Sequence, residues 1–179
     1  MDINSVLDFI LIYLVIVGEH SMQVYKYDEH YTRDIGEIKE RIHTLMQRGH
    51  SPHLIALYRG SLPMTTHLSN IIPCDMSIID FQSYDVTDGV VKEPKWILNK
   101  TREFDTLIVL DDIFDSGRTI EKVRAFLKEE RPDSYVECHV LVGGKTAAAA
   151  EVFYYTEHTG DWVVFPWEMD YEENNNKEQ

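Results

Sequence analysis

The chain has 179 residues, of which 44% are hydrophobic and 27% are charged, and its formal net charge is −14 at pH 7. This length and composition are typical of one globular domain with a buried core. The negative charge argues against a nucleic-acid backbone or an anionic membrane surface as a partner, because both would repel it. A small polyanion remains compatible with this charge, since backbone N–H groups, a few basic side chains and a metal ion can hold it locally.

Both cysteines are expected to be buried thiols. Cys74 and Cys138 lie in apolar, strand-like surroundings and lack the C-x-x-C spacing of a metal or redox pair. Free thiols persist in a reducing compartment, so we expect a cytoplasmic location.

Residues 1–21 are predicted to be an apolar appendage to a domain that begins at Met22. The apolar run Val6–Val17 is interrupted only by Asp8 and is shorter than the ~20 residues that span a bilayer. Its leading charge is Asp2, whereas a secretory signal begins with basic residues. Three interpretations stay open: a core or oligomer-packing segment, a non-native start upstream of Met22, and a membrane-associated helix. We expect no stable membrane association.

The domain, residues 22–168, is predicted to begin with a helix, a strand and a second helix. Apolar residues recur at helical spacing over 35–46. The apolar run His53–Tyr58 predicts a buried strand, which breaks at Arg59-Gly60-Ser61 and is followed by a helix over Leu62–Ile71.

A strand and a long loop follow. Asp75–Phe81 is strand-like, whereas residues 82–102 scatter Asp, Gly, Pro and Lys among few apolar residues. A loop of this length inside a compact domain is usually functional or disordered. We predict a long flexible loop over 82–102.

Thr106–Leu110 is the clearest buried strand in the chain. It leads into Asp111-Asp112, a turn at Ser116-Gly117, and an amphipathic helix that Pro132 closes. The remaining predicted strands are Tyr135–Val142, Val152–Tyr155 and Trp162–Phe165, and residues 169–179 form a polar tail that we predict to be disordered.

Strands and helices alternate along the chain, which predicts an α/β fold with a mainly parallel twisted sheet flanked by helices. Ligands of such sheets lie outside the carboxyl ends of the strands. Three breaks in the pattern fall at such ends, at Arg59-Gly60, Asp111–Thr119 and Gly143–Lys145. We therefore expect these breaks to converge on one pocket.

The segment Asp111–Thr119 carries the strongest chemical signal. A buried strand delivers two adjacent carboxylates, of which only one can face a given ligand, because successive side chains point to opposite faces. The loop that follows combines a glycine, hydroxyl groups and the free N–H groups of a helix start, which together suit a phosphate. Its residues are Asp115, Ser116, Gly117, Arg118 and Thr119. The alternative is a plain N-cap by Asp115 or Ser116, with solvated acids.

This segment resembles the signature of type I phosphoribosyltransferases, which bind 5-phosphoribosyl-1-pyrophosphate (PRPP) between two acids and a phosphate loop. The resemblance runs from about Tyr27 to Glu168. It implies the fold of that family, with a small hood of N- and C-terminal segments that here includes residues 145–168. It also implies that Asp111 and Asp112 contact the ribose hydroxyls and the waters of a Mg²⁺ ion, and that Asp115–Thr119 take the 5′-phosphate.

Two further segments match the family. Arg59-Gly60-Ser61 corresponds to the loop that binds pyrophosphate through backbone amides, often with a strained or cis peptide, although many members carry a second glycine where this chain has Ser61. Arg59 supplies a cation and Gly60 permits an unusual backbone. Ser83-Tyr84 opens the long loop, as a Ser-Tyr pair does in the flexible catalytic loop of hypoxanthine-guanine enzymes. On the residues alone, a plain strand–helix turn and an aromatic packed at a loop base are the alternatives.

The C-terminal region resembles the purine-binding hood of 6-oxopurine enzymes. There, the lysine at the position of Lys145 donates to O6, the aromatic residue at Trp162 stacks on the purine, and the backbone near Val163 and Glu168 reads the 2-position. A lysine reads an oxo group as an acceptor and is poorly matched to the amino group of adenine. For Trp162 taken alone, core packing is the alternative.

The resemblance is closest to the hypoxanthine and xanthine-guanine phosphoribosyltransferases of purine salvage. It implies transfer of the phosphoribosyl group from Mg²⁺-PRPP to N9 of hypoxanthine, guanine or xanthine, with Asp115 accepting or sharing the N7 proton. Mg²⁺ is the expected cofactor, and a homodimer or homotetramer is the expected assembly. The alternatives are transfer to another base, a non-catalytic sensor of PRPP or nucleotides on the same fold, and an oligomerisation role of the apolar N-terminus.

Overall fold

The computed structural model describes residues 22–80, 95–97 and 103–168. They form two compact units, a larger one of Tyr31–His158 and a smaller one that contains residues 22–30 and 159–168. Within the described ranges, no helix has the length and apolar character needed to cross a bilayer. The predicted appendage 1–21, the polar tail 169–179 and most of the predicted loop 82–102 lie outside the described residues.

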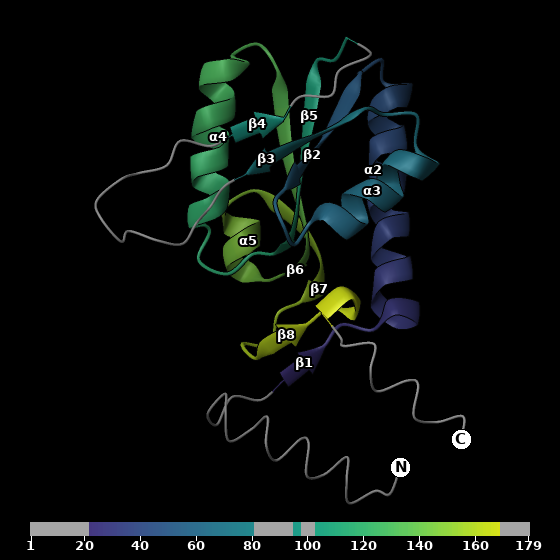
Figure 1. The fold of residues 1–179 in the computed structure, drawn as a ribbon, viewed down its shortest axis with the longest axis vertical. Helices are drawn as coiled ribbons and strands as arrows, with labels where there is room; N and C mark the ends of the chain where they lie inside the picture. Colours follow the sequence, from purple (N-terminus) through teal and green to yellow (C-terminus); the bar gives the residue numbers. More distant parts are fainter. Residues whose placement is uncertain (1–21, 81–94, 98–102, 169–179) are drawn as a thin grey trace, which may run out of the picture. The chain divides into compact units, whose positions relative to one another are not determined.

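A six-stranded sheet forms the centre of the larger unit, in the order β4-β3-β2-β5-β6-β7 (Figure 1). All neighbouring strands are parallel except β3 and β4, which are antiparallel. The strands are β2 Pro52–Leu57, β3 Met76–Asp80, β4 Lys95–Ile97, β5 Thr106–Ile113, β6 Tyr135–Gly143 and β7 Val152–Glu157. The predicted α/β fold with a mainly parallel sheet is confirmed.

Helices cover both faces of this sheet. In Figure 1, α4 and α5 lie on one side of the strands, and α2 and α3 lie on the other. The helices are α2 Thr32–Gln47, α3 Leu62–Ile71, α4 Arg118–Glu130 and α5 Lys145–Ala149, and a π-helical turn, Tyr27–Tyr31, precedes α2. Every residue of β2 is buried, as expected for a central strand covered on both faces. The apolar face of α4 joins the core through Ile120, Val123 and Leu127.

Several boundaries differ from those the sequence predicts. Strand β4 lies inside the predicted loop 82–102, because its three residues pair with the edge of β3. Strand β5 does not end at Leu110 but continues to Ile113, since Asp111 and Ile113 still pair with Val140 and Val142 of β6. Asp111 and Asp112 therefore lie within β5, near its carboxyl end. Helix α5 was also not predicted.

The smaller unit is built on two short parallel strands, β1 Met22–Val24 and β8 Trp162–Val164, with Met22 opposite Trp162. Tyr25 is fully buried and packs on Phe165 with ring centroids 5.2 Å apart. A 3₁₀ turn, Pro166–Glu168, follows β8. This arrangement confirms the predicted strand at Trp162, whereas β1 was not predicted.

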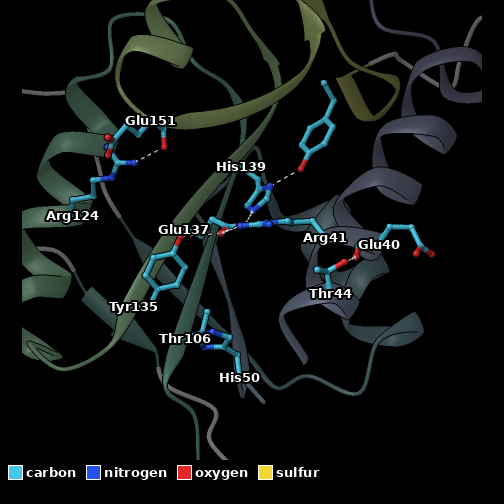
Figure 2. Close-up of polar contacts among 11 residues, drawn as sticks. Glu40, Arg41, Thr44, His50, Thr106, Arg124, Tyr135, Glu137, His139 and Glu151 are labelled. Atoms are coloured by element: carbon cyan, nitrogen blue, oxygen red, sulfur yellow. Dashed lines mark hydrogen bonds and ion pairs between the residues drawn. The ribbon is translucent and has the colours of Figure 1, made fainter. Parts of the chain in front are cut away.

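A buried polar cluster ties α2 to β6 and β7 (Figure 2). Arg41 donates from Nε and Nη2 to the two carboxylate oxygens of Glu137, at 2.8 and 2.7 Å. His139 lies between Glu137 Oε1, at 2.8 Å from its Nε2, and the Tyr155 hydroxyl, at 2.6 Å from its Nδ1. Burial alone would raise the pKa of Glu137, but the hydrogen bonds from Arg41 and His139 outweigh it and lower the pKa to about 2.

A second polar contact joins α4 and α5, the two helices on the face of the sheet opposite α2. Arg124 of α4 donates to the carbonyl oxygens of Ala150 and Glu151, at 2.6 and 2.9 Å, just beyond the end of α5. Figure 2 shows the Arg124–Glu151 bond. Backbone carbonyls at a helix end have no intrahelical partner, so a guanidinium group there satisfies two of them at once.

Candidate functional site

Two carboxylates stand at the carboxyl end of β5. Asp111 and Asp112 are both partly buried, and the Asp112 N–H donates to Asp111 Oδ1 at 3.1 Å. Burial raises the pKa of the Asp111 carboxyl well above its usual range, and the charge of Asp112 raises it further. A cation bound beside this pair would offset the repulsion between the two carboxylates.

The break after β2 packs directly against this acid pair. A side chain at Gly60 would clash with the Asp112 carboxylate, so only glycine lets the two segments approach this closely. The Tyr58–Arg59 peptide bond is cis, as the resemblance to the family implied for this loop. Arg59 is exposed, whereas Ser61 is buried and donates through Oγ to Leu57 O at 2.7 Å. The Ser61 hydroxyl thus holds the loop from inside.

The segment after β5 forms a pocket of about 400 Å³, lined by residues 111–120 and by Lys122. It contains every residue predicted for the ribose acids and the phosphate loop. Gly117 precedes α4 with a φ of 78°, a conformation that favours glycine, and a Cβ there would come within 2.8 Å of the Phe114 ring. Among the described residues no side chain caps α4, so the N-cap role considered for Asp115 or Ser116 is wrong. Ser116 instead accepts a bond from Arg118 Nε at 3.3 Å.

A helix that starts without a side-chain cap presents its first N–H groups to whatever lies in front of it. In this chain, that space is the 400 Å³ pocket. An anion placed there would meet both the N–H groups and the positive end of the helix dipole.

A second pocket, of about 250 Å³, brings the loop after β5 to the ends of β6 and β7. Its lining residues are Phe114, Asp115, Gly144, Lys145, Thr146, Glu157 and His158. Asp115 and Lys145, 30 positions apart in sequence, therefore face the same space, and Asp115 lines both pockets. Close to this pocket, Gly143 lets β6 approach β7 closely, because a Cβ there would come within 2.8 Å of Tyr154 Cβ.

Glu157 and His158 were missed in the sequence. The last predicted strand before them ended at Tyr155, but β7 continues to Glu157 and carries both residues to the carboxyl edge of the sheet. In the structure, Gly143 pairs with Glu157 in parallel register, a long-range pairing that no local sequence pattern indicates.

Of the predicted hood, residues 145–158 with Lys145 belong to the larger unit, whereas Trp162, Val163 and Glu168 belong to the smaller one. The Trp162 side chain is 58% exposed, and Val163 is buried. Exposure of so large a ring argues against core packing as its role. Glu168 accepts a hydrogen bond from the Phe165 N–H at 3.0 Å, so its carboxylate closes the 3₁₀ turn. The predicted loop residues Ser83 and Tyr84 lie outside the described residues.

In the part of the chain that the structure describes, no group of three or more Asp, Glu, His or Cys side chains could hold a metal ion alone. Mg²⁺ does not require such a group, since it commonly takes one or two carboxylates and completes its shell with waters and substrate oxygens. Asp111 and Asp112 fit that pattern.

The chain matches the family described as the phosphoribosyl transferase domain over residues 26–174. No curated protein shows significant sequence similarity to it. Among solved structures, it is similar to the xanthine-guanine-hypoxanthine phosphoribosyltransferase of Helicobacter pylori, with a TM-score of 0.68, 21% identity, and coverage of 87% of this chain and 99% of that one.

Two more solved structures share the fold. The purine phosphoribosyltransferase of Pyrococcus horikoshii has a TM-score of 0.63 at 22% identity, covering 83% of this chain and 95% of that one. The hypoxanthine phosphoribosyltransferase of Trypanosoma cruzi, in complex with the product IMP, has a TM-score of 0.52 at 20% identity, covering 73% and 76%.

Proposed function

The chain belongs to the phosphoribosyl transferase domain family, and we propose that it transfers the 5-phosphoribosyl group from Mg²⁺-PRPP to N9 of a 6-oxopurine and releases pyrophosphate. Membership makes it a phosphoribosyltransferase, a class of glycosyltransferase. The proposed substrates rest above all on the position of Asp115. This residue lines both the 400 Å³ pocket in front of α4, here called the phosphate-type pocket, and the 250 Å³ pocket that contains Lys145. A group at that junction can reach the base while the loop beside it holds the phosphate.

In the proposed reaction, PRPP lies along the carboxyl edge of the sheet. The N–H groups at the start of α4 and the hydroxyls of Ser116 and Thr119 bind its 5′-phosphate. Asp111 and Asp112 accept hydrogen bonds from the ribose hydroxyls and orient the waters of the metal ion. The backbone of the Arg59 loop and the Arg59 guanidinium bind the pyrophosphate, with Ser61 holding that loop. Mg²⁺, when bound, supplies charge neutralisation to the departing pyrophosphate.

The resemblance to 6-oxopurine enzymes supplies the contacts proposed for the base. Lys145 donates to O6, Trp162 stacks on the purine ring, and the backbone near Val163 and Glu168 contacts the 2-position. As N9 attacks C1′, the bond from C1′ to the pyrophosphate oxygen breaks and the N7 proton passes to Asp115. The long loop that contains Ser83 and Tyr84 is proposed to exclude water from this step.

We place this activity in purine salvage in the cytoplasm, carried out by a homodimer or homotetramer. The two cysteines, Cys74 and Cys138, are buried free thiols as predicted, which is compatible with a reducing compartment.

The decisive experiment is pyrophosphate release from Mg²⁺-PRPP, measured with hypoxanthine, guanine, xanthine, adenine, uracil and nicotinamide and with no base. We expect release with the oxopurines alone. Release with uracil or nicotinamide only would assign another acceptor, and PRPP binding without any release would make the chain a sensor.

Two variants test the assigned roles. Asp115→Asn should lower kcat and leave PRPP binding largely intact, because the amide cannot take the N7 proton. Lys145→Ala should mainly raise KM for the base. Unchanged turnover in the first variant, or loss of PRPP affinity in the second, would remove that residue from its role.

A further inference from the structure

The pocket shared by Asp115 and Lys145 contains a carboxylate that the proposed transfer does not use. Glu157 ends β7, is exposed, and lines this pocket together with His158. A charged group in the wall of a binding pocket selects among ligands even where it takes no part in the reaction.

The Glu157 carboxylate lies close to Lys145. Its Oε1 is 3.4 Å from where a Cβ of Gly144 would stand, so it rests against the residue that precedes Lys145. Its interaction with the Tyr154 side chain on the same strand raises the pKa of Tyr154. Glu157 and Lys145 line the same pocket.

Two acidic side chains, Asp115 and Glu157, line this pocket together with Lys145 and His158. An ionised carboxylate is a hydrogen-bond acceptor only, so it favours a base that offers N–H donors and disfavours an anionic base. A carbonyl group or an anion facing a carboxylate is repelled.

The three 6-oxopurines differ in just these properties. All three offer the N1–H, guanine adds the donating 2-amino group, and hypoxanthine has only a hydrogen atom at the 2-position. Xanthine carries a second carbonyl at the 2-position and loses a proton near neutral pH, which makes it an anion. The pocket therefore matches the first two bases and opposes the third.

We propose that Glu157 is a specificity-determining residue that directs this enzyme to guanine and hypoxanthine and against xanthine. The inference rests on the proposed function and deepens it by narrowing the substrate class. Discrimination by one charged hydrogen-bonding group is typically about 10- to 100-fold.

The test compares kcat/KM for guanine, hypoxanthine and xanthine in the wild type, in Glu157→Gln and in Glu157→Lys. Glu129→Gln is the matched control, because it removes the same charge from an exposed position on α4. We expect the wild type to prefer guanine over xanthine by about tenfold or more. The preference should shrink in Glu157→Gln, shrink further or reverse in Glu157→Lys, and stay unchanged in Glu129→Gln.

Equal use of xanthine and guanine by the wild type would overturn the inference, and so would a preference that none of the Glu157 variants alters. Absence of turnover with every base would contradict the proposed function instead. In that case, calorimetric binding of GMP and XMP to the same variants tests Glu157 on its own: weaker binding of XMP that Glu157→Gln relieves supports the inference, and equal binding overturns it.

Discussion

Two acids on neighbouring strands of the same sheet, Asp111 on β5 and Glu137 on β6, show opposite electrostatic behaviour. The pKa of Asp111 is raised and that of Glu137 is lowered, although burial acts to raise the pKa of both. The difference lies in their neighbours: Glu137 faces Arg41 and His139, whereas the neighbour that weighs most on Asp111 is Asp112. Since burial acts in the same direction on both acids, the difference in pKa between them comes from their charged partners.

Removing the charge of Glu137 should give the largest effect. Glu137→Gln leaves Arg41 facing a neutral amide in a buried cluster, and breaking such a pair costs about 3 kcal/mol. Chemical denaturation measures this loss in the free energy of unfolding, while kcat of the folded enzyme should stay unchanged. A loss as small as that of Glu129→Gln on the exposed face of α4 would show that the cluster contributes little.

Removing the charge of Asp111 should give the opposite pattern. Asp111→Asn should lower activity by about 10- to 100-fold, because residues that orient a metal's waters typically contribute that much. At neutral pH, its stability should match or exceed that of the wild type, since a carboxyl with a raised pKa disfavours folding when ionised. The exposed Asp133→Asn is the control. Destabilisation by Asp111→Asn would mean that Asp111 is a structural acid like Glu137.

The pH dependence of the free energy of unfolding should also distinguish Glu137 from Asp111. The folded-state pKa of Glu137 lies near 2, below its ordinary 4.5, so its contribution is complete above about pH 4.5 and is lost as the pH falls toward 2. The loss should reach about 2 kcal/mol by about pH 3. Urea midpoints of the wild type and Glu137→Gln should therefore converge on acidification. A constant difference between them would contradict the lowered pKa.

The smallest effect is expected at the loop that follows the acid pair. Gly117→Ala places a Cβ at a φ of 78° and 2.8 Å from the Phe114 ring, which should cost about 1 kcal/mol and raise KM for PRPP. Gly36→Ala in α2 is the matched control, since nothing lies within 4 Å of its Cβ and alanine favours a helix there. Equal effects of the two substitutions would show that the loop tolerates a side chain.

The local sequence pattern was sufficient to predict the central strand and the helix that follows it. The buried run Thr106–Leu110 and the helix after it have strong periodicity, so the strand, its helix and the pocket between them could be predicted. Parallel topology then placed Lys145 at the same edge as Asp115, as the shared pocket bears out.

Elements that depend on distant partners could not be predicted. Strands β1 and β4 have three residues each and exist only through pairing with β8 and β3. Arg41 and Glu137 are 96 positions apart, and neither lies in a pattern that indicates the other. The length of β7 depends on its register with β6, and for that reason Glu157 went unseen.

The bond from Arg124 to the end of α5 has a consequence for how the substrates meet. Helices α4 and α5 both start at the carboxyl edge, one beside the phosphate-type pocket and the other with Lys145, and Arg124 joins them away from that edge. The Arg124 bonds thus set the spacing between the two pockets before a ligand binds. In the proposed reaction, the two substrates bound at this spacing would already be arranged as the parts of one nucleotide, and little orientational freedom would be left to lose when they join.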